Sequence, residues 1–201
     1  MLRVLVGTQN KGKQQEYREL LGDLPIDWCF PEDLGLADFT PDESGLTFDE
    51  NARLKALGYA EAAGIPALAD DSGLEVDALD GAPGVFSARY AGEGATDAER
   101  YQKLLQELAD VPREKRSARF VCVVALAFPD GRVYTARGTV EGHIGFEPRG
   151  DQGFGYDPIF VLPDGRHLAE LAADQKHAIS HRGRAVETLR PTLFRVLGLN
   201  E

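Results

Sequence analysis

The strongest structural signal in the sequence is a pair of long apolar segments between residues 118 and 142. The segments ARFVCVVALAF and RVYTARGTVEG are rich in β-branched and aromatic residues, and Pro129-Asp130-Gly131 lies between them. This pattern predicts two antiparallel strands joined by a tight turn. A sheet that contains this hairpin therefore belongs in the middle of the fold.

Helical and extended segments alternate on both sides of the hairpin. The apolar residues 2–8 predict a buried strand, and apolar side chains then recur at helical spacing from Tyr17 to Leu24. Capping-box sequences at 47–50 and 96–99 predict the starts of two further helices. The combination predicts an α/β (mixed α+β) protein with a central, mixed, strongly twisted sheet flanked by helices.

The remaining segments complete this outline. PALAD predicts a short strand that delivers Asp70 at its end, and residues 81–95 read as a long ordered loop. A glycine-rich loop leads into a strand over residues 159–162, and the chain is helical from about Leu168, with a kink or break at Pro191. Residues 1–201 are expected to form one domain, with room for two lobes around a cleft.

Composition restricts the function. The net charge of −11 disfavours binding to a nucleic-acid backbone, and no apolar stretch is long enough to span a membrane. Cys29 and Cys122 fit no metal-site spacing and are expected to be buried free thiols in a reducing cytoplasm. The chain is therefore expected to be cytoplasmic and to act on a small molecule.

The stretch VGTQNKGKQQE, residues 6–16, has the outline of an anion-binding loop. A loop that leaves a strand and enters a helix directs backbone N–H groups at its ligand, to which Lys11 and Lys13 add charge and Thr8 and Asn10 add hydrogen bonds. A phosphate fits this environment, and a solvated turn with its lysines in water is the alternative. Glu16 would orient Lys13 or lie at the surface.

Asp70 and Asp71 are a candidate metal-binding pair. Successive residues of an extended chain point in opposite directions, so at most one of the two would face a given cleft. Carboxylates beside a phosphate site suit Mg²⁺, which prefers oxygen ligands and bridges to phosphate oxygens. Glu43 is a candidate further ligand for the metal, with Asp42 beside it as an alternative. The purely structural interpretation is that Asp70 and Asp71 form an Asx-turn that ends the strand.

Two further segments suit a nucleotide. Asn51 and Lys55 are four residues apart and share one helix face, which would border a cleft or lie at the surface. In GFGYDP, residues 153–158, an aromatic ring can stack on a base, and the Asp157 carboxylate can accept a hydrogen bond from the base. In the alternative interpretation, the rings of Phe154 and Tyr156 lie in the core.

The segment QKHAISHRGRA concentrates five basic side chains in an acidic chain. Favourable interaction with a helix C-terminus explains one or two of them, but not the whole group. With the anion loop, the carboxylates and the stacking loop, this cluster supplies what binding a nucleoside triphosphate requires. Its members are Lys176, His177, His181, Arg182 and Arg184.

Six sequence blocks together resemble the inosine/xanthosine triphosphate pyrophosphatase family. They occur in the family's order across nearly the whole chain, at residues 8–16, 44–56, 69–74, 81–90, 153–160 and 180–185. The resemblance implies an Mg²⁺-dependent homodimer with a cleft between two α/β lobes. It also implies hydrolysis of ITP, dITP and XTP to the monophosphate and pyrophosphate, which keeps these nucleotides out of DNA and RNA.

The resemblance also implies roles for individual residues. Asp71 and Lys13 would be catalytic, with Asp71 the proton acceptor, and Glu43 and Asp71 would bind the metal. The residues implied to bind the substrate are Thr8, Gln9, Asn10, Lys11, Gly12, Lys13, Lys55, Ser72, Phe154, Gly155, Tyr156, Asp157, Lys176, His181 and Arg182.

The chemistry expected from this set is attack of water on the α-phosphorus with pyrophosphate as the leaving group. Hydrogen-bond donors from His181, Arg182 or backbone amides would pair with the 6-oxo group of a purine. In adenine the same donors would face the 6-amino group, which is itself a donor and cannot pair with them. Two alternative functions stay open: a nucleotide sensor without turnover, and a pyrophosphatase for modified pyrimidine triphosphates.

Overall fold

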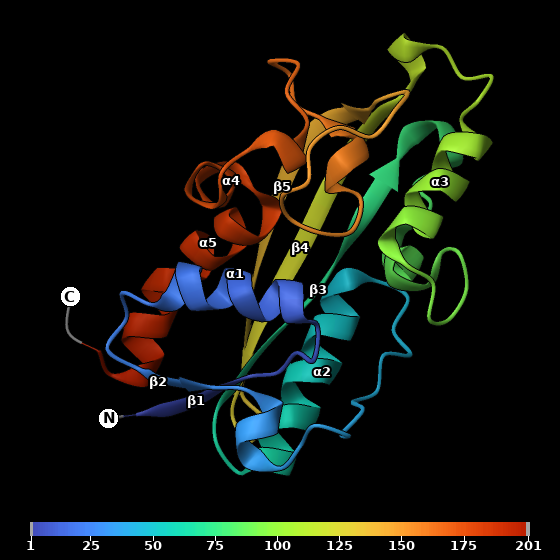
Figure 1. The fold of residues 1–201 in the computed structure, drawn as a ribbon. Coiled ribbons are helices and arrows are strands. Elements are labelled where there is room, and N and C mark those ends of the chain that lie inside the picture. The colour runs from blue at the N-terminus through green and yellow to red at the C-terminus, as the bar shows by residue number, and fades with distance from the viewer. Residues whose placement is uncertain (1, 200–201) are drawn as a thin grey trace. The chain divides into compact units, whose positions relative to one another are not determined.

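The computed structural model describes residues 2–199, and Figure 1 shows the order of its elements by colour. Six strands form one sheet in the order β2-β1-β3-β4-β5-β6. Strand β1 pairs in parallel with β2 and β3, whereas β5 pairs antiparallel with β6, so the sheet is mixed. The strands are β1 (Arg3–Val6), β2 (Asp27–Cys29), β3 (Ala67–Val76), β4 (Ser117–Ala127), β5 (Val133–Ile144) and β6 (Phe160–Val161).

Five α-helices accompany the sheet in the described part of the chain: α1 (Lys11–Leu21), α2 (Phe48–Ala63), α3 (Asp97–Glu107), α4 (Ala173–Ile179) and α5 (His181–Leu197). Both predicted capping boxes are present, at Thr47 before α2 and at Thr96 before α3. Gly64 ends α2 in the left-handed conformation, with φ of 67°. The predicted mixed α/β class, with a mixed sheet and helices, is confirmed.

The chain divides into two compact units. Unit 1 comprises residues 1–71, 122–138 and 182–201, and unit 2 comprises residues 72–121 and 139–181. Each unit has its own apolar core. Strands β3, β4 and β5 contribute residues to both units, and each unit is assembled from segments far apart in the sequence.

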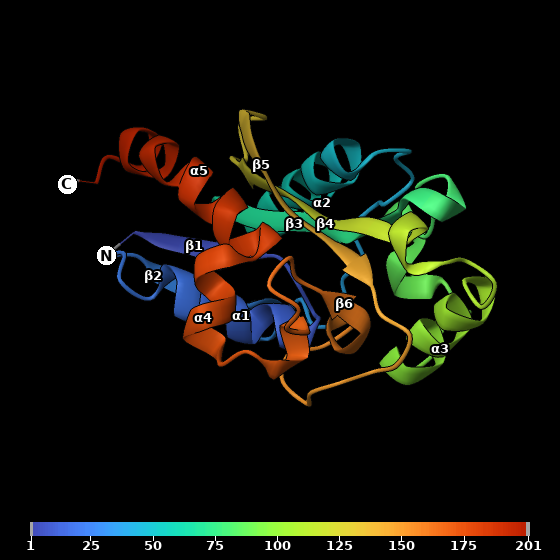
Figure 2. The ribbon, with the colours of Figure 1, turned by 90° about the horizontal axis from the view of Figure 1, so that it is seen from above.

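The core of unit 1 forms around β1. Figure 2 shows α1 and α2 on opposite sides of β1 and β3. Tyr17 and Leu21 from α1 and Leu189 and Leu193 from α5 pack in one buried cluster with Val4 of β1. Burial of each large aliphatic side chain contributes about 1.5–3 kcal/mol. This packing fixes the start of α1 next to the end of β1.

The predicted hairpin is confirmed by its turn. The Phe128 N–H donates to the Arg132 carbonyl at 2.9 Å, and Gly131 adopts φ of 90° within the turn. Both cysteines are buried and free, as expected. None of the helices in residues 2–199 has the length and apolar character needed to cross a membrane.

Three predictions about the elements need correction. Strand β3 does not end at Asp70 but runs on to Val76, so the two aspartates lie inside the strand and the Asx-turn is wrong. Helix α5 continues through Pro191 without a break, because buried Leu189 and Leu193 hold both sides of it in the core. Residues 81–95, predicted as a loop, include the 3-10 helix Gly84–Arg89. In addition, the short strand β2 was not predicted.

Candidate active site

The loop between β1 and α1 is shaped by contacts within unit 1. Asn10 caps α1, because its side-chain oxygen accepts from the Lys13 N–H at 3.0 Å. The Asn10 N–H donates to Thr8 Oγ1 at 3.2 Å, and Gln9 Nε2 donates to the Phe39 carbonyl at 2.7 Å. A Cβ at Gly7 would collide with the Tyr59 ring, so only glycine lets the loop pass there. The sequence thus builds a fixed turn at a helix N-terminus.

The two lysines of this loop point to different surroundings. Lys11 pairs with Glu32 at 2.8 Å, and 77% of its side chain is exposed. Lys13 pairs with Asp70 at 3.0 Å, and only 14% of its side chain is exposed. The alternative of a solvated lysine therefore describes Lys11, whereas Lys13 faces the carboxylates of β3. Gly12 is half-buried between them.

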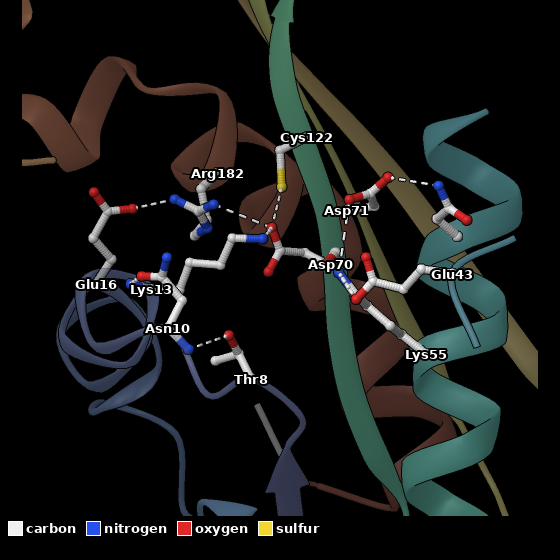
Figure 3. Close-up of polar contacts among 11 residues, drawn as sticks. Thr8, Asn10, Lys13, Glu16, Glu43, Lys55, Asp70, Asp71, Cys122 and Arg182 are labelled. Carbon is white, nitrogen blue, oxygen red and sulfur yellow. Dashed lines mark hydrogen bonds and ion pairs between the residues drawn. The ribbon is translucent and has the colours of Figure 1, made fainter. Parts of the chain in front are cut away.

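Asp70 is the centre of a buried ionic network. Lys13 Nζ lies 3.0 Å and Arg182 Nη2 lies 3.1 Å from its Oδ2 atom, and the Cys122 thiol donates to the same oxygen at 3.6 Å. Burial alone would raise the pKa of this carboxyl, but Lys13 and Arg182 outweigh burial and hold the pKa far below its usual range. Figure 3 shows Lys13, Arg182 and Cys122 around Asp70. Asp70 is therefore a permanent anion at neutral pH.

Glu16 completes this network through Arg182. The Arg182 guanidinium is buried and donates through Nη1 to Glu16 and through Nη2 to Asp70. Burial opposes the charge of Arg182, but the two carboxylates raise the pKa of its guanidinium well above the usual value. Glu16 is buried and pairs with Arg182, so the interpretation of Glu16 as a surface charge is wrong. Two cations and two anions alternate, so each buried charge has a partner.

Asp71 leaves β3 on the side opposite to Asp70, as the alternation of an extended chain predicts (Figure 3). Asn51 Nδ2 donates to its Oδ2 at 3.2 Å, and Lys55 Nζ lies 3.7 Å from its Oδ1. Burial raises the pKa of the Asp71 carboxyl, and the opposing charges of Lys55 and Lys13 do not cancel this effect. The two adjacent aspartates therefore have pKa values that are shifted in opposite directions.

Glu43 belongs to the Asp71 side of the strand. Its Oε1 atom lies 3.0 Å from Lys55 Nζ, which also donates to the Asp70 carbonyl at 3.3 Å. Asp42 instead accepts from the backbone N–H and the hydroxyl of Ser44, at 2.9 and 3.0 Å. Asn51 and Lys55 do share one face of α2, and that face is directed at Asp71. Of the two alternatives for the acidic partner, the geometry favours Glu43.

These carboxylates are compatible with one hard cation. No group of three or more His, Cys, Asp and Glu side chains in residues 2–199 is arranged to hold a metal ion by itself. Glu43 and Asp71 nevertheless contact the same ammonium group, that of Lys55. Mg²⁺ characteristically uses one or two carboxylates together with substrate phosphates and water. The donor set therefore suits a metal that arrives with a phosphate ligand.

Of the predicted base-binding residues, Arg182 lies in unit 1, and the others lie in unit 2. Asp157 pairs with Lys176 at 2.6 Å and accepts from the Phe154 N–H at 3.0 Å, while Lys176 Nζ lies 5.1 Å from the centre of the Phe154 ring. Phe154 is half-buried, whereas Tyr156 is buried. The alternative of a core aromatic residue therefore holds for Tyr156 but not for Phe154.

Two other predicted residues of unit 2 have separate surroundings. The His181 ring stacks on Phe120, with 4.8 Å between ring centres and 13° between the planes. Ser72 follows Asp71 on β3 and is half-buried. The substrate contacts of His181 and Ser72 stay predictions.

No local sequence pattern indicates some of the pairings in the site. Glu16 and Arg182 are 166 positions apart, and Cys122 is 52 positions from Asp70. Only the excess of charge in otherwise apolar segments marks them, because a buried charge requires a partner. Asn51 was the exception, since its helical spacing from Lys55 indicated a shared face.

The fold and these contacts define a class of protein: a mixed α/β protein with a strand-to-helix loop at a helix N-terminus, a buried ionic network and two aspartates on one strand. The Ham1 family model matches residues 4–192, and the chain belongs to the Ham1 family.

Individual relatives are similar over nearly their full length. The dITP/XTP pyrophosphatase of Exiguobacterium sibiricum is 50% identical over 198 residues, which are 98% of this chain and 100% of the relative. The protein of the same name from Geobacter sulfurreducens is 50% identical over 96% of this chain and 97% of its own. A solved HAM1 protein from Coxiella burnetii has a TM-score of 0.87 and 47% identity, covering 97% of this chain and 100% of the solved chain.

Proposed function

We propose that this chain hydrolyses deaminated purine nucleoside triphosphates, namely ITP, dITP and XTP, to the monophosphate and pyrophosphate. The observation that carries the proposal is 50% identity over nearly the whole length to proteins named dITP/XTP pyrophosphatase. Buried cations and carboxylates next to a helix N-terminus supply the groups that such a reaction requires.

In the proposed reaction the protein performs little covalent chemistry and acts by positioning and by charge. The loop Thr8–Lys13 would hold the phosphates, with Lys13 stabilising the negative charge that develops during the attack. Asp71 would accept the proton of the attacking water. Asp70 is unsuited to that role, because Lys13 and Arg182 stabilise its anion and make it a very weak base, whereas the ammonium group of Lys55 lies farther from Asp71.

The metal proposed for this site is Mg²⁺, held by Glu43 and Asp71. When bound, it would neutralise phosphate charge and lower the pKa of a coordinated water. The ammonium group of Lys55 contacts both of these carboxylates.

Selection of the base would depend on unit 2. Phe154 would stack on the purine, and Asp157, Lys176, His181 and backbone amides would meet its polar edge. A donor facing the 6-oxo group of hypoxanthine or xanthine would face a 6-amino donor in adenine, and an unpaired buried polar group costs much affinity. Guanine would be rejected because its 2-amino group finds neither a partner nor space. A homodimer and a cytoplasmic location are part of the same proposal.

A substrate panel tests the function. Pyrophosphate release would be measured for ITP, XTP, GTP, ATP, dUTP and methylated pyrimidine triphosphates, with and without Mg²⁺. We expect kcat/KM for ITP and XTP to exceed that for GTP and ATP by at least about 100-fold, since rejection of a mispaired polar group reaches such factors, and we expect no turnover without a divalent cation. Binding without pyrophosphate release would favour a sensor, and preference for a pyrimidine would favour the other alternative.

A further inference from the structure

The proposed base-binding loop, Gly153–Asp157, needs external support to keep one conformation. Gly153 and Gly155 have φ of 75° and 65°, a region that glycine enters without strain. Such residues lose more conformational entropy on ordering than any others. A loop of this composition binds a flat ligand tightly only if its conformation is fixed before binding, because otherwise the free energy needed to order the loop weakens the affinity.

Asp97 provides part of this support from the first turn of α3. The Gly155 N–H donates to Asp97 Oδ2 at 2.7 Å across 58 residues of sequence. Asp97 is not needed to cap α3, because Thr96 and Glu99 already form the capping box. Its carboxylate is therefore available to hold the loop.

Arg100 fixes the orientation of Asp97. Arg100 Nη1 donates to Asp97 Oδ1 at 2.7 Å, and Nη2 donates to the Ala95 carbonyl at 2.6 Å. The guanidinium thus bridges the carboxylate to the backbone that precedes α3. Hydrogen bonds between ionised groups are about twice as strong as neutral ones, so this bridge restrains the Asp97 side chain.

A second anchor holds the other side of the same loop. The Tyr156 hydroxyl donates to the Ser87 carbonyl at 2.7 Å, and Ser87 Oγ accepts from the Leu74 N–H of β3 at 2.9 Å. This anchor uses a buried aromatic side chain and a strand. The hydrogen bond to Asp97 restrains the backbone at Gly155, which lies between Phe154 and Tyr156 in the sequence.

We propose that Asp97, oriented by Arg100, is a positioning residue that pre-organises the Phe154–Asp157 loop for the purine base. This inference rests on the proposed function, because it takes that loop as the base-binding segment. Asp97 acts through Gly155 and does not touch the substrate. Loss of Asp97 weakens binding of ligands that carry the base and leaves binding of pyrophosphate unchanged.

The test compares Asp97→Ala, Asp97→Asn and Arg100→Gln with the control Asp49→Ala. Asp49 is matched because it lies in the first turn of α2 and pairs with Arg53 at 2.6 Å, in unit 1. The readouts are KM and kcat for ITP, and the Kd values of IMP and pyrophosphate by calorimetry. The melting temperature of each variant shows that it is folded, and Arg100→Gln serves if Asp97→Ala does not fold.

For Asp97→Ala we expect KM for ITP and Kd for IMP to rise about tenfold, because loss of one charge-assisted hydrogen bond corresponds to roughly this factor. The kcat should stay within about twofold of the wild-type value, and the Kd for pyrophosphate should be unchanged. Asp97→Asn and Arg100→Gln should give smaller rises, and Asp49→Ala none. Equal weakening of IMP and pyrophosphate, or an unchanged Kd for IMP, would overturn the inference. Absence of ITP hydrolysis by the wild-type protein would instead refute the proposed function, while the IMP titrations would still decide on Asp97.

Discussion

Replacing Asp71 by asparagine is expected to lower kcat for ITP by about 10²–10⁴-fold, the range by which a positioned general base accelerates proton transfer. Asparagine has nearly the same shape and keeps the hydrogen bond from Asn51, but it cannot accept the proton of the attacking water. The affinity for nucleotide should largely persist, because Lys13 and the loop of α1 are unchanged. Steady-state kinetics and binding of a non-hydrolysable analogue measure both quantities.

The same variant is expected to be at least as stable as the wild-type protein at pH 7 in the absence of metal. Burial raises the pKa of Asp71 in the folded state, so ionised Asp71 costs folding free energy at any pH above that raised pKa. The cost declines as the pH falls below the raised pKa and is gone below the unfolded pKa of about 4, because the carboxyl is then neutral in both states. The melting temperature of Asp71→Asn should therefore equal or exceed that of the wild type at pH 7, and the difference should vanish in acid.

A matched variant separates the role of Asp71 from a general effect of charge. Asp42 lies near Glu43 in the sequence and is exposed, and its contacts are to Ser44 alone among those described for it. Asp42→Asn removes one negative charge from the same region and should keep kcat within about twofold. Near-wild-type turnover of Asp71→Asn would remove Asp71 from the mechanism.

The variant Asp70→Asn is expected to lose about 3–5 kcal/mol of unfolding free energy, the usual cost of removing one partner from a buried ion pair. The cations Lys13 and Arg182 would then both lose the carboxylate that they contact. Urea unfolding at pH 7 measures the loss. The control is Asp77→Asn, whose partner Arg119 lies near the surface of unit 2, and it should cost at most about 1 kcal/mol.

The pH dependence of stability gives an independent check on Asp70. Its pKa in the fold is below the unfolded value, so its stabilisation is complete above about pH 4 and is lost as the pH falls below that value. Asp70→Asn should therefore be destabilised at pH 7 and approach the wild type as the pH falls below about 4. A loss smaller than 1 kcal/mol at pH 7 would mean that the network contributes little.

Local patterns predicted much of the fold. The hairpin turn at Pro129–Gly131 and the capping boxes at Thr47 and Thr96 depend on a few neighbouring residues, and all are present. The full length of β3 was not predictable in this way. Its aspartates are unfavourable in a buried strand unless cations from elsewhere in the chain neutralise them.

The site was predicted best where its residues lie close in sequence. The shared face of Asn51 and Lys55 and the opposite orientations of Asp70 and Asp71 follow from helix and strand periodicity. The pairing of Glu16 with Arg182 depends on how α5 returns beside α1, which no local pattern specifies. The resemblance to a family named Arg182 as a substrate-binding residue, and the structure adds that it holds Asp70.

The central claim is that water attacks the α-phosphorus of a deaminated purine nucleotide, and hydrolysis of ITP in H₂¹⁸O tests it most directly. Mass spectrometry of the products should find a single ¹⁸O atom in the monophosphate and unlabelled pyrophosphate. Label in the pyrophosphate would place the attack at the β-phosphorus, and release of orthophosphate would mean that another bond is cleaved. Either result would contradict the account.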